Sequence, residues 1–382
     1  NSCVVRQSAE DRVTGMLSYI KPLKQRNHQR VVALMGCAVG PETSLGLQQR
    51  FPYVDVFMRP QQYQPLMDIL GKRLGMSGDD CLKDLTPARP HVASYVPIVH
   101  GCDKFCTFCI VPYRRGRERS RPVEEVAREV EALARRGVRE VTLLGQNVDS
   151  YGRDLEGCPD LATLLSEVSR IEGVERIRSL TSHPNDMTDR IIHAMADLPK
   201  VCEHINLPFQ AGDDAVLQNM RRGYTADDYR RLVERIRAAI PSVSMSTDVI
   251  IGFPRETETQ FQATLDLLRD IRFDKVHAAV YSPRPGTIAA RTMVDSVPAE
   301  EKKERFQALE EIQEQIATSI NARLLGQRVE VLVDGHHRGQ WQGRSRSDKL
   351  VFFPHEDDLL GKIVQVRIEK TSPWSLQGVL VH

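Results

Sequence analysis

Residues 94–109 read SYVPIVHGCDKFCTFC, an apolar stretch that runs directly into a loop with three cysteines. The stretch 94–99 predicts a buried β-strand. Further apolar stretches of strand length follow along the chain, at 139–144, 175–181, 203–208, 243–251 and 274–281. Amphipathic helices are expected between most of them, as in 123–134, where apolar residues recur at helical spacing.

Six strands that alternate with helices predict a parallel sheet with right-handed crossovers. A complete eight-stranded α/β barrel needs roughly 250 residues, so a partial barrel of six strand–helix units fits this chain better. In such barrels the functional groups lie at the carboxyl ends of the strands. The cysteine loop follows the first strand and is therefore expected at this end.

Smaller domains are expected on both sides of the barrel. In the N-terminal part, a helix at 9–20 and strands at 31–34 and 53–57 predict a small α/β domain. At the C-terminal end, a long helix at 298–324 precedes short strands separated by Asp-Gly, His-Arg-Gly and Ser-Pro turns, which predict a small closed β-barrel. These strands are 328–333, 349–353, 363–368 and 378–381. The expected domains are 1–75, 88–320 and 321–382, and 75–90 is expected to be a linker.

The composition is typical of a globular protein. Of 382 residues, 41% are hydrophobic and 27% charged, and 52 Lys plus Arg balance 51 Asp plus Glu. This balance argues against a protein that coats nucleic acid by bulk charge, and no apolar run approaches the length of a membrane span. The chain begins with Asn1, and we expect it to start inside a longer natural sequence. A cytoplasmic location without membrane association is expected.

Three of the eight cysteines, Cys102, Cys106 and Cys109, lie within eight residues. Such crowding is typical of metal ligation in a reducing compartment. Three thiolates can hold one side of a 4Fe–4S cube and leave one iron open for a small ligand, whereas four would close it. A zinc site completed by a residue such as His100, or a buried cysteine cluster, remains an alternative.

The spacing Cys-x-x-x-Cys-x-x-Cys after the first strand of a partial barrel resembles the radical S-adenosylmethionine (SAM) superfamily. The resemblance implies that Cys102, Cys106 and Cys109 hold a 4Fe–4S cluster whose open iron binds SAM. One electron from the cluster then cleaves SAM to a 5′-deoxyadenosyl radical. Phe108 stands where the superfamily places an aromatic residue beside the adenine, with loop packing as its alternative role.

Further motifs resemble the methylthiotransferase family within this superfamily. The similarity covers essentially the whole chain, and from it Gln146, Asn147, Gln210 and Asp248 are expected to orient SAM. No acid–base catalytic residue is expected, because a radical abstracts the hydrogen. The motifs are 110–122 (IVPYRRGRERSRP), 144–148 (LGQNV), 181–184 (TSHP), 206–212 (NLPFQAG), 221–225 (RRGYT), 248–254 (DVIIGFP) and 281–287 (YSPRPGT).

The same family carries a second 4Fe–4S cluster in its N-terminal domain. The segments around Cys3 and Cys37 resemble those that bear its second and third ligands. The first ligand is expected upstream of Asn1, so this chain, as an N-terminal truncation, is expected to lack one ligand of that cluster. Cys3 and Cys37 as buried structural thiols are the alternative. The remaining cysteines, Cys81, Cys158 and Cys202, match no ligand position.

Residues 325–380 resemble a TRAM domain, a small RNA-binding β-barrel. Arg344 and Arg346 are expected to contact RNA there, and Arg114 and Arg115, beside the cysteine loop, to contact substrate or SAM. Solvated surface positions are the alternative for such residues. Further candidates are Arg338, Lys349, Lys362 and Lys370 for phosphates and Trp341, Phe352 and Phe353 for base stacking.

The resemblance therefore implies a tRNA methylthiotransferase that converts N6-isopentenyladenosine beside the anticodon to its 2-methylthio derivative. It also implies a flavodoxin- or ferredoxin-like electron donor, and we expect a monomer. Within the family, enzymes that act on threonylcarbamoyl-adenosine or on a ribosomal-protein aspartate are alternatives. A non-catalytic, metal-containing RNA-binding protein is an alternative of a different class.

Overall fold

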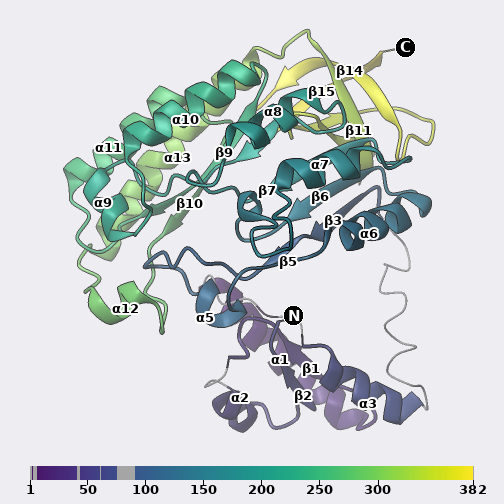
Figure 1. The fold of residues 1–382 in the computed structure, drawn as a ribbon, viewed down its shortest axis with the longest axis vertical. Coiled ribbons are helices and arrows are strands. Elements are labelled where there is room, and N and C mark those ends of the chain that lie inside the picture. Colours follow the sequence, from purple (N-terminus) through teal and green to yellow (C-terminus); the bar gives the residue numbers. More distant parts are fainter. Residues whose placement is uncertain (1, 3–6, 41–43, 61, 75–90, 382) are drawn as a thin grey trace. The chain divides into compact units, whose positions relative to one another are not determined.

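The computed structural model describes residues 2, 7–40, 44–60, 62–74 and 91–381. Cys3, Cys81 and the expected linker 75–90 lie outside the described residues. The chain forms two compact units, and we describe each by itself (Figure 1). The first comprises Asn1–Pro87, Gly101–Arg117 and Ser282–Met293, and the second comprises Ala88–His100, Glu118–Tyr281 and Val294–His382.

The first unit contains a small parallel sheet packed on a helix. Strands β1 (Ala33–Met35) and β2 (Val56–Met58) pair in parallel, and α1 (Gln7–Arg26) buries Leu17 against their core. We expected this helix to end at residue 20, but it continues past Pro22. Its last turn is fixed by Lys24, whose ammonium lies 2.8 Å from the carboxylate of Asp55. The unit also contains α2 (Ser44–Arg50), α3 (Gln64–Leu74), α5 (Val111–Arg115) and α12 (Ile288–Thr292).

The second unit is built on the expected parallel strands, and the prediction of a six-stranded partial barrel is confirmed. β3, β6 and β7 pair in this order, as do β8, β9 and β10. A parallel bridge between Ile177 and Val201 joins β7 to the start of β8, and the amide of Ser182 donates to the carbonyl of Asn206 at the other end. The strands are β3 (Ala93–Pro97), β6 (Glu140–Leu144), β7 (Arg176–Leu180), β8 (His204–Asn206), β9 (Ser244–Ile251) and β10 (Lys275–Val280). A short antiparallel pair, β4 (Val99–His100) and β5 (Arg119–Ser120), follows β3.

Amphipathic helices connect the strands, as the spacing of apolar residues predicts. In α6 (Val123–Arg135), Val126, Val130 and Leu133 occupy one face and are at most 2% exposed. The other helices are η1 (Val148–Ser150), α7 (Leu161–Ser169), α8 (Asp189–Asp197), α9 (Asp214–Asn219), α10 (Ala226–Ala239), α11 (Glu258–Ile271) and α13 (Ala299–Ala322). In the part of the chain that the structure describes, none of the helices combines the length and apolar character that crossing a membrane requires.

The C-terminal part forms a closed five-stranded barrel in the order β11-β12-β13-β15-β14. Its core contains Val331, Val351, Phe353 and Val366, each fully buried. Four of the strands were expected, but β12 was missed, because its polar sequence QWQGRS lacks the apolar alternation of a strand. The strands are β11 (Arg328–His337), β12 (Gln340–Ser345), β13 (Leu350–Phe353), β14 (Ile363–Thr371) and β15 (Leu376–Val381).

Asp334 and Gly335 do not form the expected Asp-Gly turn. They lie inside β11, where the register with β12 shifts between Val333 and Gly335. A β-bulge places an extra residue in one strand and increases its local twist, so a dipeptide typical of turns here bends a continuous strand. The expected His-Arg-Gly turn is confirmed: the chain reverses at Arg338 and Gly339, both with positive φ.

Two buried arginines of β7 attach the C-terminal barrel to the parallel strands. Arg176, 0% exposed, donates from Nη1 to the carbonyl of Arg344 at 2.6 Å. Arg178, 4% exposed, donates from Nη1 to the carbonyl of Arg346 at 2.8 Å and from Nη2 to that of Ser345 at 2.7 Å. Because these bonds end on backbone atoms of the β12 segment, they fix the position of this segment independently of its side chains.

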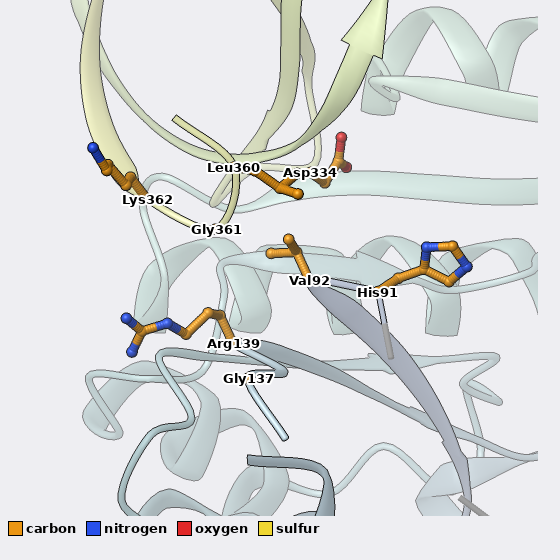
Figure 2. Close-up of a pocket in the computed structure, with 8 residues that line it drawn as sticks. All are labelled: His91, Val92, Gly137, Arg139, Asp334, Leu360, Gly361 and Lys362. Atoms are coloured by element: carbon orange, nitrogen blue, oxygen red, sulfur yellow. The ribbon is translucent and has the colours of Figure 1, made fainter. Parts of the chain in front are cut away.

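A cavity of about 520 Å³ lies between the same two parts of the second unit. Figure 2 shows the lining residues Val92 and Leu360 between the charged ends of Arg139 and Lys362 on one side and Asp334 on the other. Val92 and Arg139 directly precede β3 and β6, so the cavity is at the amino ends of the strands. It is therefore separate from the carboxyl ends, where barrel enzymes bind substrate.

Candidate functional site

The cysteine loop belongs to the first unit. Cys102 and Cys106 are 9% and 6% exposed, and Cys109 is half-buried. The amide of Cys109 donates to the carbonyl of Cys106 at 3.0 Å, and the amide of Cys102 donates to that of Gly116 at 3.2 Å. These two hydrogen bonds stabilise the backbone of the loop that carries the three cysteines.

Local sequence features fix the conformation of this loop. Gly101 has φ 73°, and a Cβ atom there would lie 2.1 Å from the carbonyl oxygen of Arg117, so only glycine fits. Phe105 has φ 47°, a strained conformation for a residue with a side chain. Its ring contacts Tyr113 edge-on, and Asp103 pairs with Arg117 at 2.6 Å. Such strain is typical of functional loops.

The donor set of the loop fits a 4Fe–4S cluster by its chemistry, since thiolates are the ligands of such clusters. Among the described residues, no three His, Cys, Asp or Glu side chains form a group that could hold a single metal ion. A 4Fe–4S cluster does not require its three cysteine thiolates to meet at one metal ion, because each thiolate binds a different iron of the cube. Cys102, Cys106 and Cys109 would hold this cluster.

Cys37 lies in the same unit as the loop and is 4% exposed. Its sulfur accepts a hydrogen bond from Nε of Arg115 in α5 at 3.3 Å, and it packs against Ile110. The amide of Cys37 donates to the carbonyl of Ser2, which directly precedes Cys3. The structure thus brings the segment of one expected second-cluster ligand beside the cysteine loop, while Cys3 lies outside the described residues.

The other cysteines differ in exposure. Cys202 is 1% exposed, and burial raises its pKa to about 11, so this thiol stays protonated at neutral pH. Cys158 is exposed. The environment of Cys202 is therefore not that of an activated thiolate.

The expected SAM-orienting residues of the second unit lie after the strands β6 and β8 or within β9. Gln146 and Asn147 follow β6, Gln210 follows β8, and Asp248 lies in β9. Asn206 donates from Nδ2 to Oδ2 of Asp248 at 3.2 Å. Gln210 has φ 72°, an unusual conformation that turns the chain just after the strand. Phe108, in the first unit, is half-buried.

Asp149 is a buried carboxylate that the sequence analysis missed. It is 4% exposed and accepts hydrogen bonds from Oγ of Ser182 and the amide of His183, each at 3.0 Å. Burial raises its pKa to about 7, although both bonds favour the charged form. Its position two residues after Asn147, in a loop that follows a strand, is the one sequence signal that could have identified it.

Asp186 was missed as well. It is 3% exposed, accepts a hydrogen bond from Nδ2 of Asn147 at 2.6 Å and pairs with Arg153 at 2.8 Å. It lies just beyond the TSHP motif, in the loop between β7 and α8. Asp149 and Asp186 together connect the carboxyl ends of β6 and β7.

His204 in β8 makes the stability of the second unit sensitive to acid. It is 5% exposed, and burial lowers its pKa to about 4. The unfolded chain binds a proton near pH 6.5 whereas the folded chain does so only near pH 4, so stability decreases as the pH falls through this range. The loss should approach about 3 kcal/mol at pH 4.

We expect His204→Gln to lose less stability than the wild type between pH 6.5 and pH 4, as measured by denaturant titrations. An unchanged pH dependence of stability in this variant would contradict the assignment to His204.

Arg346 is engaged within the second unit. Its guanidinium donates to the carboxylate of Glu203, with contacts of 2.8 and 2.9 Å, and to the carbonyl of Val201 at 2.6 Å. Arg344 is more exposed and bonds to Asp348. The expected RNA contacts of both residues stay predictions, but these bonds favour a structural role for Arg346. Phe353 is 0% exposed in the barrel core, which argues against base stacking there.

Arg114 and Arg115 form the last turn of α5 and are half-buried. Arg115 donates to Cys37 as described above. Their expected contacts with substrate or SAM stay predictions.

Comparison with known proteins agrees with the fold and the loop. Residues 96–268 match the model of the radical SAM superfamily, and residues 322–381 match that of the TRAM domain. The fold resembles the cobalamin-dependent S-adenosylmethionine radical enzyme OxsB, with a TM-score of 0.50 at 12% identity over 79% of this chain and 46% of that one. The partial barrel, the cysteine loop and these matches define a radical SAM enzyme.

Relatives with the same name cover the full length of the chain. The tRNA-2-methylthio-N(6)-dimethylallyladenosine synthase of Roseiflexus sp. (strain RS-1) is 51% identical over 100% of this chain and 81% of its own length. The synthase of the same name from Dehalococcoides mccartyi (strain CBDB1) is 49% identical over 100% of this chain and 88% of its own. The chain therefore belongs to the tRNA-2-methylthio-N(6)-dimethylallyladenosine synthase family and is a methylthiotransferase.

Proposed function

We propose that this protein converts N6-isopentenyladenosine beside the anticodon of tRNA to its 2-methylthio derivative. The observation that carries the proposal is the loop of Cys102, Cys106 and Cys109 in a chain that resembles the named synthases from end to end. A tRNA anticodon loop offers an unstacked base at low energetic cost. A tRNA substrate also implies a cytoplasmic location, as the sequence analysis expects.

The three loop cysteines hold a 4Fe–4S cluster with one iron open for SAM. When bound, this pair supplies one-electron radical chemistry, which the protein itself cannot perform. Phe108 contacts the adenine, and Gln146, Asn147, Gln210 and Asp248 orient SAM. The protein excludes water from the site and positions the base.

Cys3 and Cys37 contribute to a second 4Fe–4S cluster. The burial of Cys37 and the hydrogen bond from Arg115 to its sulfur support this role, because hydrogen bonds to ligand sulfurs orient them and tune clusters. A flavodoxin- or ferredoxin-like protein delivers the electrons, and the enzyme acts as a monomer.

The domain division that accompanies this proposal is 1–75 for the domain of the second cluster, 88–320 for the radical SAM core and 321–382 for the TRAM domain. RNA contacts from Arg114 and Arg115 lie next to the cysteine loop in the chain, and those from Arg344 and Arg346 lie in the TRAM domain. Of the two TRAM residues, Arg344 is the better candidate, because its side chain is 43% exposed and that of Arg346 only 26%.

The substrate is tested by mass spectrometry of tRNA nucleosides from cells that lack the gene. We expect the 2-methylthio form to disappear and the isopentenyl form to accumulate, because only the last step is blocked. A plasmid with the full-length gene should restore the wild-type pattern, whereas a plasmid with Cys106→Ala should not. Unchanged isopentenyl derivatives together with loss of a methylthio-threonylcarbamoyl nucleoside would assign the enzyme to the other tRNA branch of the family.

A further inference from the structure

The side-chain amide of Asn147 is held in one orientation inside the protein. Asn147 follows β6 and is 2% exposed. Its Nδ2 donates to Oδ2 of Asp186 at 2.6 Å. Its Oδ1 is buried and has no hydrogen-bond partner among the described residues. A buried acceptor left unpaired costs about 1–3 kcal/mol, and such an atom in a native protein calls for an explanation such as a ligand.

Asp186 determines which end of this amide is the unpaired one. An ionised carboxylate only accepts hydrogen bonds, so it bonds the amide nitrogen of Asn147 and excludes the flipped orientation. Asp186 is itself fixed, because its other oxygen lies 2.8 Å from Nη2 of Arg153. The oxygen of Asn147 is thereby kept as an acceptor.

The backbone that carries this pair is fixed as well. The amide of Val148 donates to the carbonyl of Thr181 at 3.0 Å, and Asp149 binds Ser182 and His183 across the same two loops. Thr181 has φ 74°, which is strained for a β-branched residue. Strain that is held in place beside a strand end is typical of a preorganised binding site.

We propose that Asp186 is a positioning residue that orients Asn147 so that its oxygen accepts a hydrogen bond from SAM. The donor is a positively charged N–H group, of the kind SAM carries on its methionine moiety. An uncharged amide oxygen accepts from any N–H donor, and a hydrogen bond from a charged donor is about twice as strong as a neutral one. The identity of the ligand rests on the proposed function, while the orientation of the amide rests on the contacts described above.

The test compares the SAM affinity of three cluster-loaded variants with that of the wild type, by anaerobic equilibrium dialysis without tRNA or reductant. In Asp186→Asn, the partner no longer dictates the orientation of Asn147, and we expect SAM binding to weaken about tenfold or more. The exchange variant Asn147→Asp with Asp186→Asn restores one donor–acceptor pair and leaves an oxygen at position 147. We expect its affinity to return to within about threefold of the wild type.

Asp197→Asn, which makes the same charge change at the exposed end of α8, should bind SAM as the wild type does. Iron content and thermal unfolding of every variant report whether cluster and fold are retained. Wild-type affinity in a folded Asp186→Asn variant would overturn the proposal, as would an exchange variant that binds no better than Asp186→Asn. If Asp186→Asn does not fold, the exchange variant decides, since it keeps the internal bond. A wild-type protein that binds no SAM would instead contradict the proposed function.

Discussion

Replacing Cys106 with alanine should abolish SAM cleavage, the largest effect that we expect from any single substitution. Two thiolates cannot hold a cube that the chain binds with three, so the cluster of the loop should be lost with the side chain. Cys106 is 6% exposed and also supplies the carbonyl that binds the amide of Cys109. We expect the release of 5′-deoxyadenosine on reduction to fall to the background level, and iron and sulfide contents to decrease.

A cysteine outside the loop provides the matched control. Cys158 is exposed in the second unit, and Cys158→Ala should keep both the cluster content and the release of 5′-deoxyadenosine. Chromatography of the anaerobic reaction measures the nucleoside, and colorimetric assays measure iron and sulfide. A Cys106→Ala protein that still releases 5′-deoxyadenosine would mean that other residues hold the cluster.

Replacing Arg178 with methionine should destabilise the second unit strongly. The substitution removes the two hydrogen bonds to the carbonyls of Ser345 and Arg346. It also leaves the carboxylate of Glu140, 3.0 Å from Nε of Arg178 and 6% exposed, without its counter-ion. Removal of one partner of a buried ion pair costs about 3–5 kcal/mol. We therefore expect a clear decrease in the denaturant concentration at the midpoint of unfolding.

Two further variants separate the effect of the buried charge from that of the lost contacts. Arg178→Met with Glu140→Leu removes both charges and should recover a large part of the stability. Arg170→Met, at a surface pair with Glu167, should change stability by less than about 1 kcal/mol. If Arg178→Met unfolds at the same midpoint as Arg170→Met, the buried arginines do not attach the C-terminal barrel as we describe.

Elements with a strong pattern were predictable from the sequence. The helix α6 and strands such as β6 and β9 are buried stretches whose apolar pattern is visible in the sequence. The strand β12 is polar, and it is stabilised by pairing with β11 on one side and β13 on the other. The Asp334-Gly335 bulge and the continuation of α1 past Pro22 are further cases in which tertiary contacts outweigh a local signal.

The candidate site was predictable where its residues are adjacent in the sequence. Cys102, Cys106 and Cys109 lie within eight residues of the chain, so their spacing in the sequence was sufficient to identify the loop. Asp149 and Asp186 act through partners that are 33 to 39 residues away in the chain, and this proximity exists only once β6 and β7 lie side by side. For the same reason the sequence could not show that Arg346 binds Glu203.

We propose that the three thiolates of the cysteine loop hold a cluster whose remaining iron binds SAM. Electron–nuclear double resonance of the reduced full chain, with SAM carrying ¹⁵N in its amino group and ¹⁷O in its carboxylate, tests it directly. We predict hyperfine coupling from both labels, which disappears in Cys106→Ala and persists in Cys158→Ala. A cluster that shows no coupling to either label, and instead carries a fourth ligand from the protein, would contradict the account.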